Sequence, residues 1–265
     1  MTHAIARTVP LPRQADAFSR VSIVIPTRNE EATIGRLLDD LAAATATLPQ
    51  WDFEVIVVDD GSSDRGPAIA RAKRAIVVRH EGPHGKGAAL RRGFDVASGD
   101  CLVMMDGDYS HRAEDLGALL EALQPGVSLV VGSRIYGGSE EYTPVRALGN
   151  VALTYLFGML HGRYLSDALN GYKAFRRQVF SDFDYVSTGF DIEIELVCNA
   201  LRTGGRVVEV PSHERARGGG YSKSRVIRHG TMFLWREIAE WVRTRRQPPE
   251  PAATPQARRA VSQKV

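Results

Sequence analysis

Residues 101–111 read CLVMMDGDYSH, an apolar run that leads into two carboxylates separated by one glycine. An apolar run without alternation is typical of a strand that is covered on both faces of its sheet. Ligands of open α/β sheets gather beyond the carboxyl ends of the strands, and Asp106 and Asp108 follow such an end. Two acids this close repel each other unless a cation or hydrogen-bond donors compensate them.

A hard divalent cation, Mg²⁺ or Mn²⁺, would compensate both acids, because it takes oxygen ligands and keeps positions open for substrate phosphates. Asp106 and Asp108 are therefore candidate metal ligands. The same residues would also suit a plain acidic turn after a strand, since a short motif is only a hypothesis until its context agrees. The rest of the chain supplies that context.

The composition describes an ordinary globular protein. The chain has 265 residues, of which 43% are hydrophobic and 25% are charged, which suits one large domain or two small ones. The net charge of +3 is too modest to indicate nucleic acid as a partner. Cys101 and Cys198 lie in apolar contexts without the spacing of a metal site, which predicts a reduced, cytoplasmic setting.

No targeting or membrane-spanning segment is evident in the sequence. Arginines and prolines interrupt residues 1–20, so this stretch lacks the apolar centre of a signal peptide. No stretch approaches the roughly 18 apolar residues that span a bilayer. We expect a cytoplasmic protein that, where it works at a membrane, lies peripherally on the inner face of the cell membrane.

Strands and helices alternate along the first half of the chain. Strands are expected at residues 21–25, 53–58, 75–78 and 101–105, with helices between them, the first at about residues 31–44. This spacing predicts an α/β protein with a doubly wound, mostly parallel sheet that is flanked by helices.

The second half carries more cations and loops. Strands are expected at residues 129–131 and 206–210, with a helix at about residues 145–161. Residues 215–225 combine four cations with a glycine run, which suits a flexible loop that closes over phosphates, or else a solvated basic loop. Lys86, which opens a helix between two glycines, likewise suits either a phosphate at the helix start or solvent.

Residues 224–246 predict a basic amphipathic helix at the carboxyl-terminal end. Apolar residues recur there at helical spacing, Trp235 and Trp241 among them, and arginines supply positive charge. Such a helix suits an anionic membrane surface, and the alternative is that its apolar stripe packs on the domain's own core. Residues 1–19 are expected to form a flexible leader and residues 247–265 a disordered tail.

Four motifs follow one another along the chain: IPTRNE at residues 25–30, VVDDGSSD at 57–64, GKGAA at 85–89 and DGDYSH at 106–111. In this order they resemble family 2 glycosyltransferases of the GT-A fold. The resemblance covers about residues 20–240.

Within that family, the sequence is most similar to dolichyl- or polyprenyl-phosphate mannosyl- and glucosyltransferases. This likeness rests on GSR at residues 132–134, on residues 167–175, and on Arg217 followed by Ser222 and Lys223. It implies a GT-A catalytic domain at residues 20–223. The nucleotide-sugar half would lie at about residues 20–132, and the acceptor half at about residues 133–223.

The resemblance implies a role for each matching position. Those that would line the nucleotide-sugar pocket are Pro26, Thr27, Arg28, Glu30, Asp59, Asp60, Lys86, Asp106 and Gly107. Those that would hold the metal against the diphosphate are Asp106, Asp108 and Ser110. Those that would bind donor or acceptor phosphates, or lie on the acceptor side, are Arg134, Arg146, Asn150, Asp167, Arg217 and Lys223. The candidate catalytic residues are Asp108, Asp191, Arg134 and Arg217.

The chain departs from the family pattern at three points. Gly107 stands where Ala is common. Ser110 stands where many bacterial relatives have Gln, which makes it the weakest of the three candidate metal ligands. The transmembrane helices that many bacterial relatives carry after the catalytic domain have no counterpart here.

The resemblance implies a metal-dependent, inverting transfer of a hexose from a nucleotide sugar of the GDP-mannose or UDP-glucose type to a polyprenyl phosphate. A polyprenyl phosphate is already anionic near neutral pH, so it needs positioning and no protein base. A soluble hydroxyl acceptor, such as a natural product or a polysaccharide, would need one.

Asp191 is the candidate for such a base, because it falls near the position where hydroxyl-using relatives carry theirs. The alternative for Asp191 is a charge on a helix face, which is also our interpretation of Glu195. A non-catalytic nucleotide-sugar-binding protein is the remaining hypothesis, and the presence of both motif carboxylates disfavours it.

Overall fold

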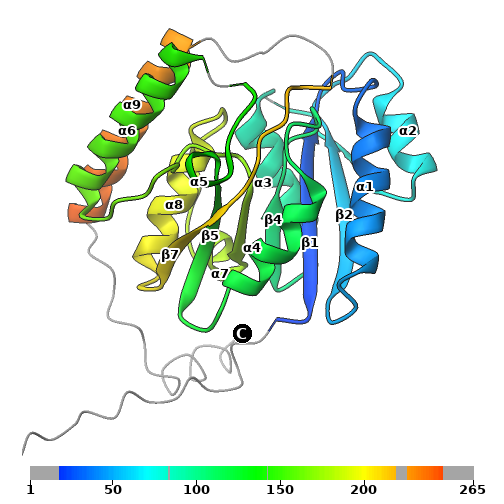
Figure 1. Ribbon diagram of the computed structural model, residues 1–265, viewed down its shortest axis with the longest axis horizontal. Helices are drawn as coiled ribbons and strands as arrows, with labels where there is room; N and C mark the ends of the chain where they lie inside the picture. Colours follow the sequence, from blue (N-terminus) through cyan, green and yellow to red (C-terminus); the bar gives the residue numbers. More distant parts are fainter. Residues whose placement is uncertain (1–17, 83, 142, 219–225, 247–265) are drawn as a thin grey trace, which may run out of the picture.

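The computed structural model describes residues 18–82, 84–141, 143–218 and 226–246. Most of the predicted leader, Lys223 and the predicted tail at residues 247–265 lie outside the described residues. The described chain forms a seven-stranded sheet in the order β3-β2-β1-β4-β6-β5-β7, with helices on both of its faces (Figure 1).

The elements alternate along the chain much as the hydrophobic pattern predicts. The strands are β1 (Arg20–Thr27), β2 (Asp52–Asp59), β3 (Ile76–Arg79), β4 (Cys101–Met104), β5 (Val127–Ser133), β6 (Lys173–Arg176) and β7 (Arg206–Pro211). The helices are α1 (Ile34–Ala46), α2 (Gly66–Ala72), α3 (Lys86–Val96), η2 (Ala113–Asp115), α4 (Leu116–Ala122), α5 (Arg134–Gly137), α6 (Pro144–His161), α7 (Gln178–Ser181), α8 (Ile192–Arg202) and α9 (Val226–Arg246).

The predicted doubly wound, mostly parallel sheet is confirmed, with one exception. β6 runs antiparallel to both of its neighbours, β4 and β5. No strand was expected at Lys173–Arg176, because four residues with a cation at each end carry little hydrophobic periodicity. The strand forms because its backbone pairs with β4 on one side and with β5 on the other.

β4 explains why an apolar run without alternation precedes the two acids. Its four residues are 0% exposed. Cys101 and Val103 belong to the core that α1 and α4 cover, whereas Leu102 and Met104 belong to the core that α3 and α8 cover. Both faces of the strand are therefore dry, and burial of such side chains stabilises each face by roughly 1.5–3 kcal/mol per residue.

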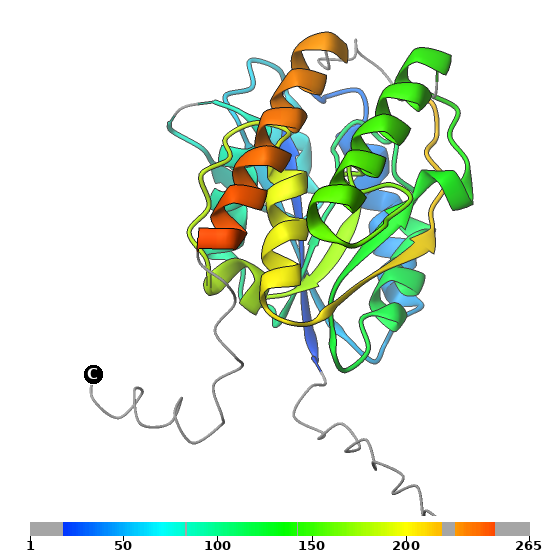
Figure 2. The same ribbon diagram turned by 90° about the vertical axis from the view of Figure 1, so that its left-hand side faces the viewer.

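α6 and α9 lie side by side, and both views show the pair outside α8 (Figures 1 and 2). The amphipathic helix expected at residues 224–246 is α9. Phe233 packs against the core, whereas Trp235 is 71% exposed, so part of the apolar stripe faces the protein and part faces away. Within the described chain, no helix combines the length and the apolar character needed to cross a bilayer.

Candidate active site

The motifs IPTRNE, VVDDGSSD and DGDYSH follow or end three neighbouring strands and meet at one edge of the sheet. β1 lies between β2 and β4, and its last residue, Thr27, pairs with Asp59. The Asp60 N–H donates to the Thr27 carbonyl at 2.9 Å. A Cβ added at Gly107 would lie 2.8 Å from the Thr27 methyl, so the DGD turn packs directly against the end of β1.

The VVDDGSSD motif forms a compact acidic corner. Asp59 and Asp60 are both buried. Asp59 Oδ1 accepts from the Ser62 N–H at 2.8 Å, and Asp60 Oδ2 accepts from the Gly85 N–H at 3.0 Å. Asp60 Oδ1 lies 3.0 Å from His84 Nδ1. Asp60 thus attaches the loop before α3 to the end of β2.

The IPTRNE motif turns the chain from β1 into α1. Pro26 is half-buried and Arg28 is exposed. The Glu30 carbonyl accepts from the Ile34 N–H at 2.9 Å, which starts the helix. Asn29 has a φ of 57°, a left-handed conformation that Asn tolerates better than most residues, and it accepts from the Ser63 N–H at 2.8 Å.

Lys86 is not solvated, because it forms a buried bridge between two acids. Its Nζ lies 2.6 Å from Asp106 Oδ1 and 2.7 Å from Glu193 Oε1. Burial disfavours the ammonium, but the two carboxylates outweigh it, and the pKa of Lys86 is raised. Burial also opposes the Asp106 carboxylate, yet Lys86 lowers the pKa of Asp106 to about 2. Lys86 and Asp106 are therefore both charged at neutral pH.

The contact of Glu193 with Lys86 was not predicted from the sequence. Glu193 lies 107 residues from Lys86, in a helix whose acids give no periodic signal for an inward carboxylate. Gly171 completes this corner. A Cβ there would lie 2.8 Å from Lys86 Nζ and 2.9 Å from Asp106 Oδ2, so only glycine lets the backbone pass so close to the bridge.

Asp108 has a separate set of partners. Ser110 Oγ donates to Asp108 Oδ1 at 2.6 Å, and the Ser110 N–H donates to the same oxygen at 3.1 Å. Arg217 Nη1 lies 2.9 Å from Asp108 Oδ2. The structure therefore brings Asp108, Ser110 and Arg217 together from the DGD turn and the loop that follows β7.

The donor set of this corner suits a metal only in part. Among the described residues, no group of three or more His, Cys, Asp or Glu side chains could hold an ion by itself. Asp106, Asp108 and the Ser110 hydroxyl offer hard oxygen atoms, which fit Mg²⁺ or Mn²⁺ when a substrate diphosphate supplies the remaining ligands. Lys86 and Arg217 balance the two acids here.

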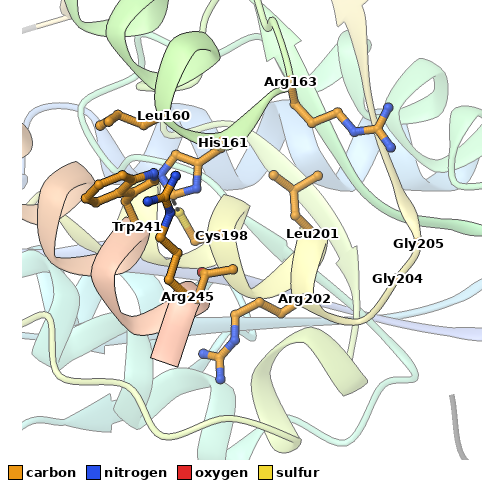
Figure 3. Close-up of a pocket in the computed structure, with 11 residues that line it drawn as sticks. Leu160, His161, Arg163, Cys198, Leu201, Arg202, Gly204, Gly205, Trp241 and Arg245 are labelled. Carbon is orange, nitrogen blue, oxygen red and sulfur yellow. Dashed lines mark hydrogen bonds between the residues drawn. The ribbon is translucent and has the colours of Figure 1, made fainter. Parts of the chain in front are cut away.

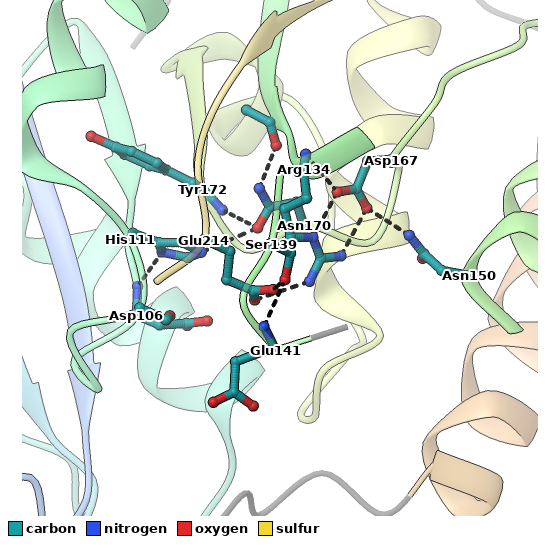
Figure 4. A network of polar contacts seen from close by, with 12 residues as sticks. Asp106, His111, Arg134, Ser139, Glu141, Asn150, Asp167, Asn170, Tyr172 and Glu214 are labelled. Carbon is teal, nitrogen blue, oxygen red and sulfur yellow. Dashed lines mark hydrogen bonds and ion pairs between the residues drawn. The ribbon is translucent and has the colours of Figure 1, made fainter. Parts of the chain in front are cut away.

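His111 and Asn170 hold the DGD turn in place through hydrogen bonds. The sequence motifs predicted no individual role for either residue. His111 Nδ1 accepts from the Asp106 N–H at 3.1 Å, so Nε2 carries the proton and donates to Asn170 Oδ1 at 3.1 Å (Figure 4). The His111 ring stacks on Tyr172, with centroids 5.1 Å apart. Asn170 Nδ2 in turn donates to the Gly132 carbonyl.

Arg134, which follows β5, and Asp167, in the loop before β6, form a second ion pair (Figure 4). Asp167 accepts from Arg134 Nε at 2.7 Å, from Arg134 Nη2 at 2.8 Å and from Asn150 Nδ2 at 2.9 Å. Burial opposes the carboxylate, but Arg134 outweighs it and keeps the pKa of Asp167 low. The side chain of Arg146 and the whole of Lys223 lie outside the described part of the chain.

Asp191 begins α8 and faces α9. Its Oδ2 accepts from Arg236 Nε at 2.9 Å and from Arg236 Nη2 at 2.7 Å. Its Oδ1 accepts from the Gly189 N–H at 3.2 Å. Both oxygens of the predicted base therefore already have protein donors.

Comparison with known proteins agrees with this geometry. The model of the family described as glycosyl transferase family 2 matches residues 22–183. The chain is 34% identical over 203 residues to the dolichyl-phosphate hexose transferase of Haloferax volcanii, across 76% of this chain and 86% of the relative. It is 36% identical over 252 residues to the polyprenol monophosphomannose synthase of Mycolicibacterium smegmatis, across 87% of this chain and 89% of the relative.

A solved structure shares the fold. Glucosyl-3-phosphoglycerate synthase from Mycobacterium tuberculosis, in complex with Mn²⁺, UDP-glucose and phosphoglyceric acid, superposes with a TM-score of 0.70 at 23% identity. The match covers 84% of this chain and 80% of that one, and it confirms the predicted GT-A architecture. Because the family model and both relatives span most of the ordered elements, the chain belongs to glycosyl transferase family 2.

Proposed function

We propose that this protein transfers a hexose from a nucleoside-diphosphate sugar to a polyprenyl phosphate, with inversion and with Mg²⁺ or Mn²⁺. The observation that carries the proposal is the pair of acids after β4, each matched by a cation, Lys86 for Asp106 and Arg217 for Asp108. The two relatives described above are named for transfer to lipid phosphates, which supports the acceptor class.

The donor would lie along the carboxyl ends of β1, β2 and β4. Asp59 and Asp60, with Thr27, form the corner that suits ribose hydroxyls and base edges. Asp106, Asp108 and Ser110 would hold the metal, which neutralises charge on the diphosphate. Lys86 and Arg217 are preorganised cations beside that position, where fixed charges are worth most to the departing diphosphate.

Arg134 is our candidate for the acceptor phosphate. Asp167 holds two nitrogens of its guanidinium, which fixes the plane of the side chain before a ligand arrives. Glu214 contacts Nη1 at 3.2 Å. A planar guanidinium that is held in place binds phosphate oxygens at low entropic cost.

The state of Asp191 favours a phosphate over a hydroxyl acceptor. Arg236 and the Gly189 N–H occupy its two oxygens, so a hydroxyl proton would have to displace one of them. A phosphate acceptor needs no such base. Transfer to a soluble hydroxyl acceptor, with Asp191 as base, remains the second candidate, because Asp191 lies two residues before Glu193, which contacts Lys86.

We further propose peripheral contact with the inner face of the cell membrane. On α6, Leu148, Val151, Tyr155 and Met159 follow one another at helical spacing and are all exposed. Trp235 of the adjacent α9 is exposed too. Exposed apolar and aromatic residues on two adjacent helices suit the headgroup boundary, where a polyprenyl phosphate presents its phosphate.

The test is to incubate the protein with labelled GDP-mannose or UDP-glucose, polyprenyl phosphate and Mg²⁺ or Mn²⁺. We expect an acid-labile glycosyl-phosphate lipid, a loss of more than about 100-fold in Asp108→Ala, and little change in the exposed control Asp95→Ala. Asp191→Asn should retain lipid product, whereas a hydroxyl-transferring enzyme would lose turnover. Absence of product with every donor, or equal rates in the Asp108 and Asp95 variants, would overturn the proposal.

A further inference from the structure

A cavity lies between the carboxyl-terminal ends of three helices (Figure 3). Its volume is about 310 Å³, and it is bounded by α6, α8, α9 and the turn that follows α8. The residues that define its chemistry are Leu160, Arg163, Leu201, Arg202, Trp241 and Arg245.

This cavity is separate from the candidate active site. Glu193, in the first turn of α8, contacts Lys86 at the sheet edge, whereas Leu201 and Arg202 end the same helix and line the cavity. α8 has 11 residues, which corresponds to roughly 16 Å at 1.5 Å per residue. A ligand here would therefore not reach the residues that we assign to sugar transfer.

Three arginines line the cavity without an acid to balance them. Within the described residues, none of the guanidiniums of Arg163, Arg202 and Arg245 forms an ion pair with a carboxylate. By contrast, Arg236 and Arg243 of the same helical layer do pair with acids. A pocket with unbalanced guanidiniums favours an anion.

The contacts of Arg202 point to an absent acceptor. Its Nη1 donates to Asn199 Oδ1 at 3.2 Å and its guanidinium lies 4.6 Å from the Phe183 ring centroid. Its Nε is buried and has no acceptor in the structure. Burial, followed by the charge of Arg243, lowers the pKa of Arg202. An anion at this position would accept a hydrogen bond from Nε and would stabilise the charged form of Arg202.

The nearest buried acids do not supply the negative charge that would balance these arginines. Burial raises the pKa of Glu237 to about 8 and also raises the pKa of Glu240, so Glu237 holds its proton at neutral pH. Glu240 is already shared between Arg236 and Arg243. The charge of Glu240 also reaches Arg202, but no described carboxylate forms an ion pair with Arg163 or Arg245.

The remaining wall is apolar. Leu160 and Leu201 contribute apolar side chains to it, and the Arg245 guanidinium lies over the Trp241 ring, 4.0 Å from its centroid. Cations above an apolar floor suit a phosphate that is carried on an apolar body.

We propose that this cavity binds the phosphate group of an anionic amphiphile, supplied either by a phospholipid headgroup or by a soluble phosphate ester. Arg163 and Arg245 would contact the phosphate at the opening, and the buried Nε of Arg202 would donate from inside. The apolar part of the ligand would lie against Trp241. The proposal is independent of the sugar-transfer chemistry, because no residue is shared between the two sites.

The test uses the whole protein and the double variant Arg163→Gln/Arg245→Gln. The probes are phosphatidylcholine vesicles with and without phosphatidylglycerol, sn-glycerol 3-phosphate and inorganic phosphate. We expect the wild type to bind a phosphate-bearing probe, and the double variant to bind it roughly 25-fold more weakly, at roughly fivefold per arginine. The matched control Arg71→Gln/Arg92→Gln removes two exposed arginines elsewhere and should change binding less than about twofold.

Intrinsic fluorescence localises the probe. A ligand-induced change in emission should disappear in Trp241→Phe and persist in Trp235→Phe. Binding to anionic vesicles alone identifies a lipid headgroup, and equal binding of sn-glycerol 3-phosphate identifies a soluble ester; both support the site. No binding of any phosphate-bearing probe, or equal losses in the pocket and control variants, would overturn it, whatever the outcome of the transfer assay.

Discussion

Two buried acidic regions of this protein differ in protonation. At the sheet edge, Asp106 lies beside Lys86, and its pKa is lowered to about 2 in spite of burial. On α9, Glu237 is 0% exposed, and neither of its carboxylate oxygens has a hydrogen-bond partner among the described residues. Burial alone raises the pKa of Glu237 to about 8. Asp106 keeps 25% of its side chain exposed and has a cation beside it, whereas Glu237 has neither solvent nor a cation to stabilise a charge.

This difference explains which region is suited to chemistry. Charges that are held by partners of opposite sign stay ionised and keep their geometry when a phosphate arrives. Glu193 and Arg217 extend this pattern at the sheet edge. A buried acid without a partner instead holds a proton and packs as a polar group, at a cost to stability.

Lys86→Met is expected to have the largest effect, and it tests whether the cation stabilises the two acids. It leaves Asp106 and Glu193 without their shared partner. We expect a loss of about 4 kcal/mol in the free energy of unfolding, together with loss of transfer. Urea denaturation measures the first effect. The matched control is Lys73→Met, which removes an exposed partner 2.7 Å from Asp39 and should cost no more than about 1 kcal/mol. Equal losses in the free energy of unfolding for the two variants would show that burial does not change the contribution of an ion pair to stability.

Asp167→Asn tests the second paired acid. The amide has one acceptor oxygen where the carboxylate has two, so it cannot hold both Nε and Nη2 of Arg134, and the guanidinium loses its fixed plane. We expect a loss of about 3 kcal/mol in stability and a rise in the KM for the lipid acceptor. The KM for the nucleotide sugar should stay near the wild-type value. A selective rise in the donor KM would contradict our placement of Arg134.

Glu237→Gln tests the acid without a partner, and here we expect a gain. The folded pKa of about 8 lies above the ordinary value of 4.5, so the wild type loses stability as the pH rises from about 4.5 to 8. The variant has no such loss. Its advantage should be about 2 kcal/mol at pH 8 and smaller at pH 5, measured by urea denaturation at both values.

The exposed acid of α4, Glu121, provides the control for that experiment. Glu121→Gln removes the same charge from a solvated position and should leave the pH dependence of stability unchanged. If Glu237→Gln behaves in the same way, Glu237 is not protonated in the folded protein, and the comparison fails.

The amino-acid pattern predicted most of the sheet and the location of the candidate site. Residues 101–105 are apolar throughout because both faces of β4 are covered, and that requirement is visible in the sequence itself. Parallel strands end at one edge, so the acids after β2 and β4 could be placed near each other before any contact was known. Turn-forming Gly and Asp residues marked those ends.

Contacts between distant segments could not be predicted in this way. β6 is antiparallel because β4 and β5 hold it, and its own four residues do not indicate a strand. Glu193 reaches Lys86 only because α8 packs beside α3, and Arg236 reaches Asp191 only because α9 packs on α8. Periodicity reports which face of an element is buried, whereas the partner of a buried charge depends on how whole elements pack. The sequence alone determined the strand ends where chemistry is placed, and tertiary packing decided which of its buried acids are charged.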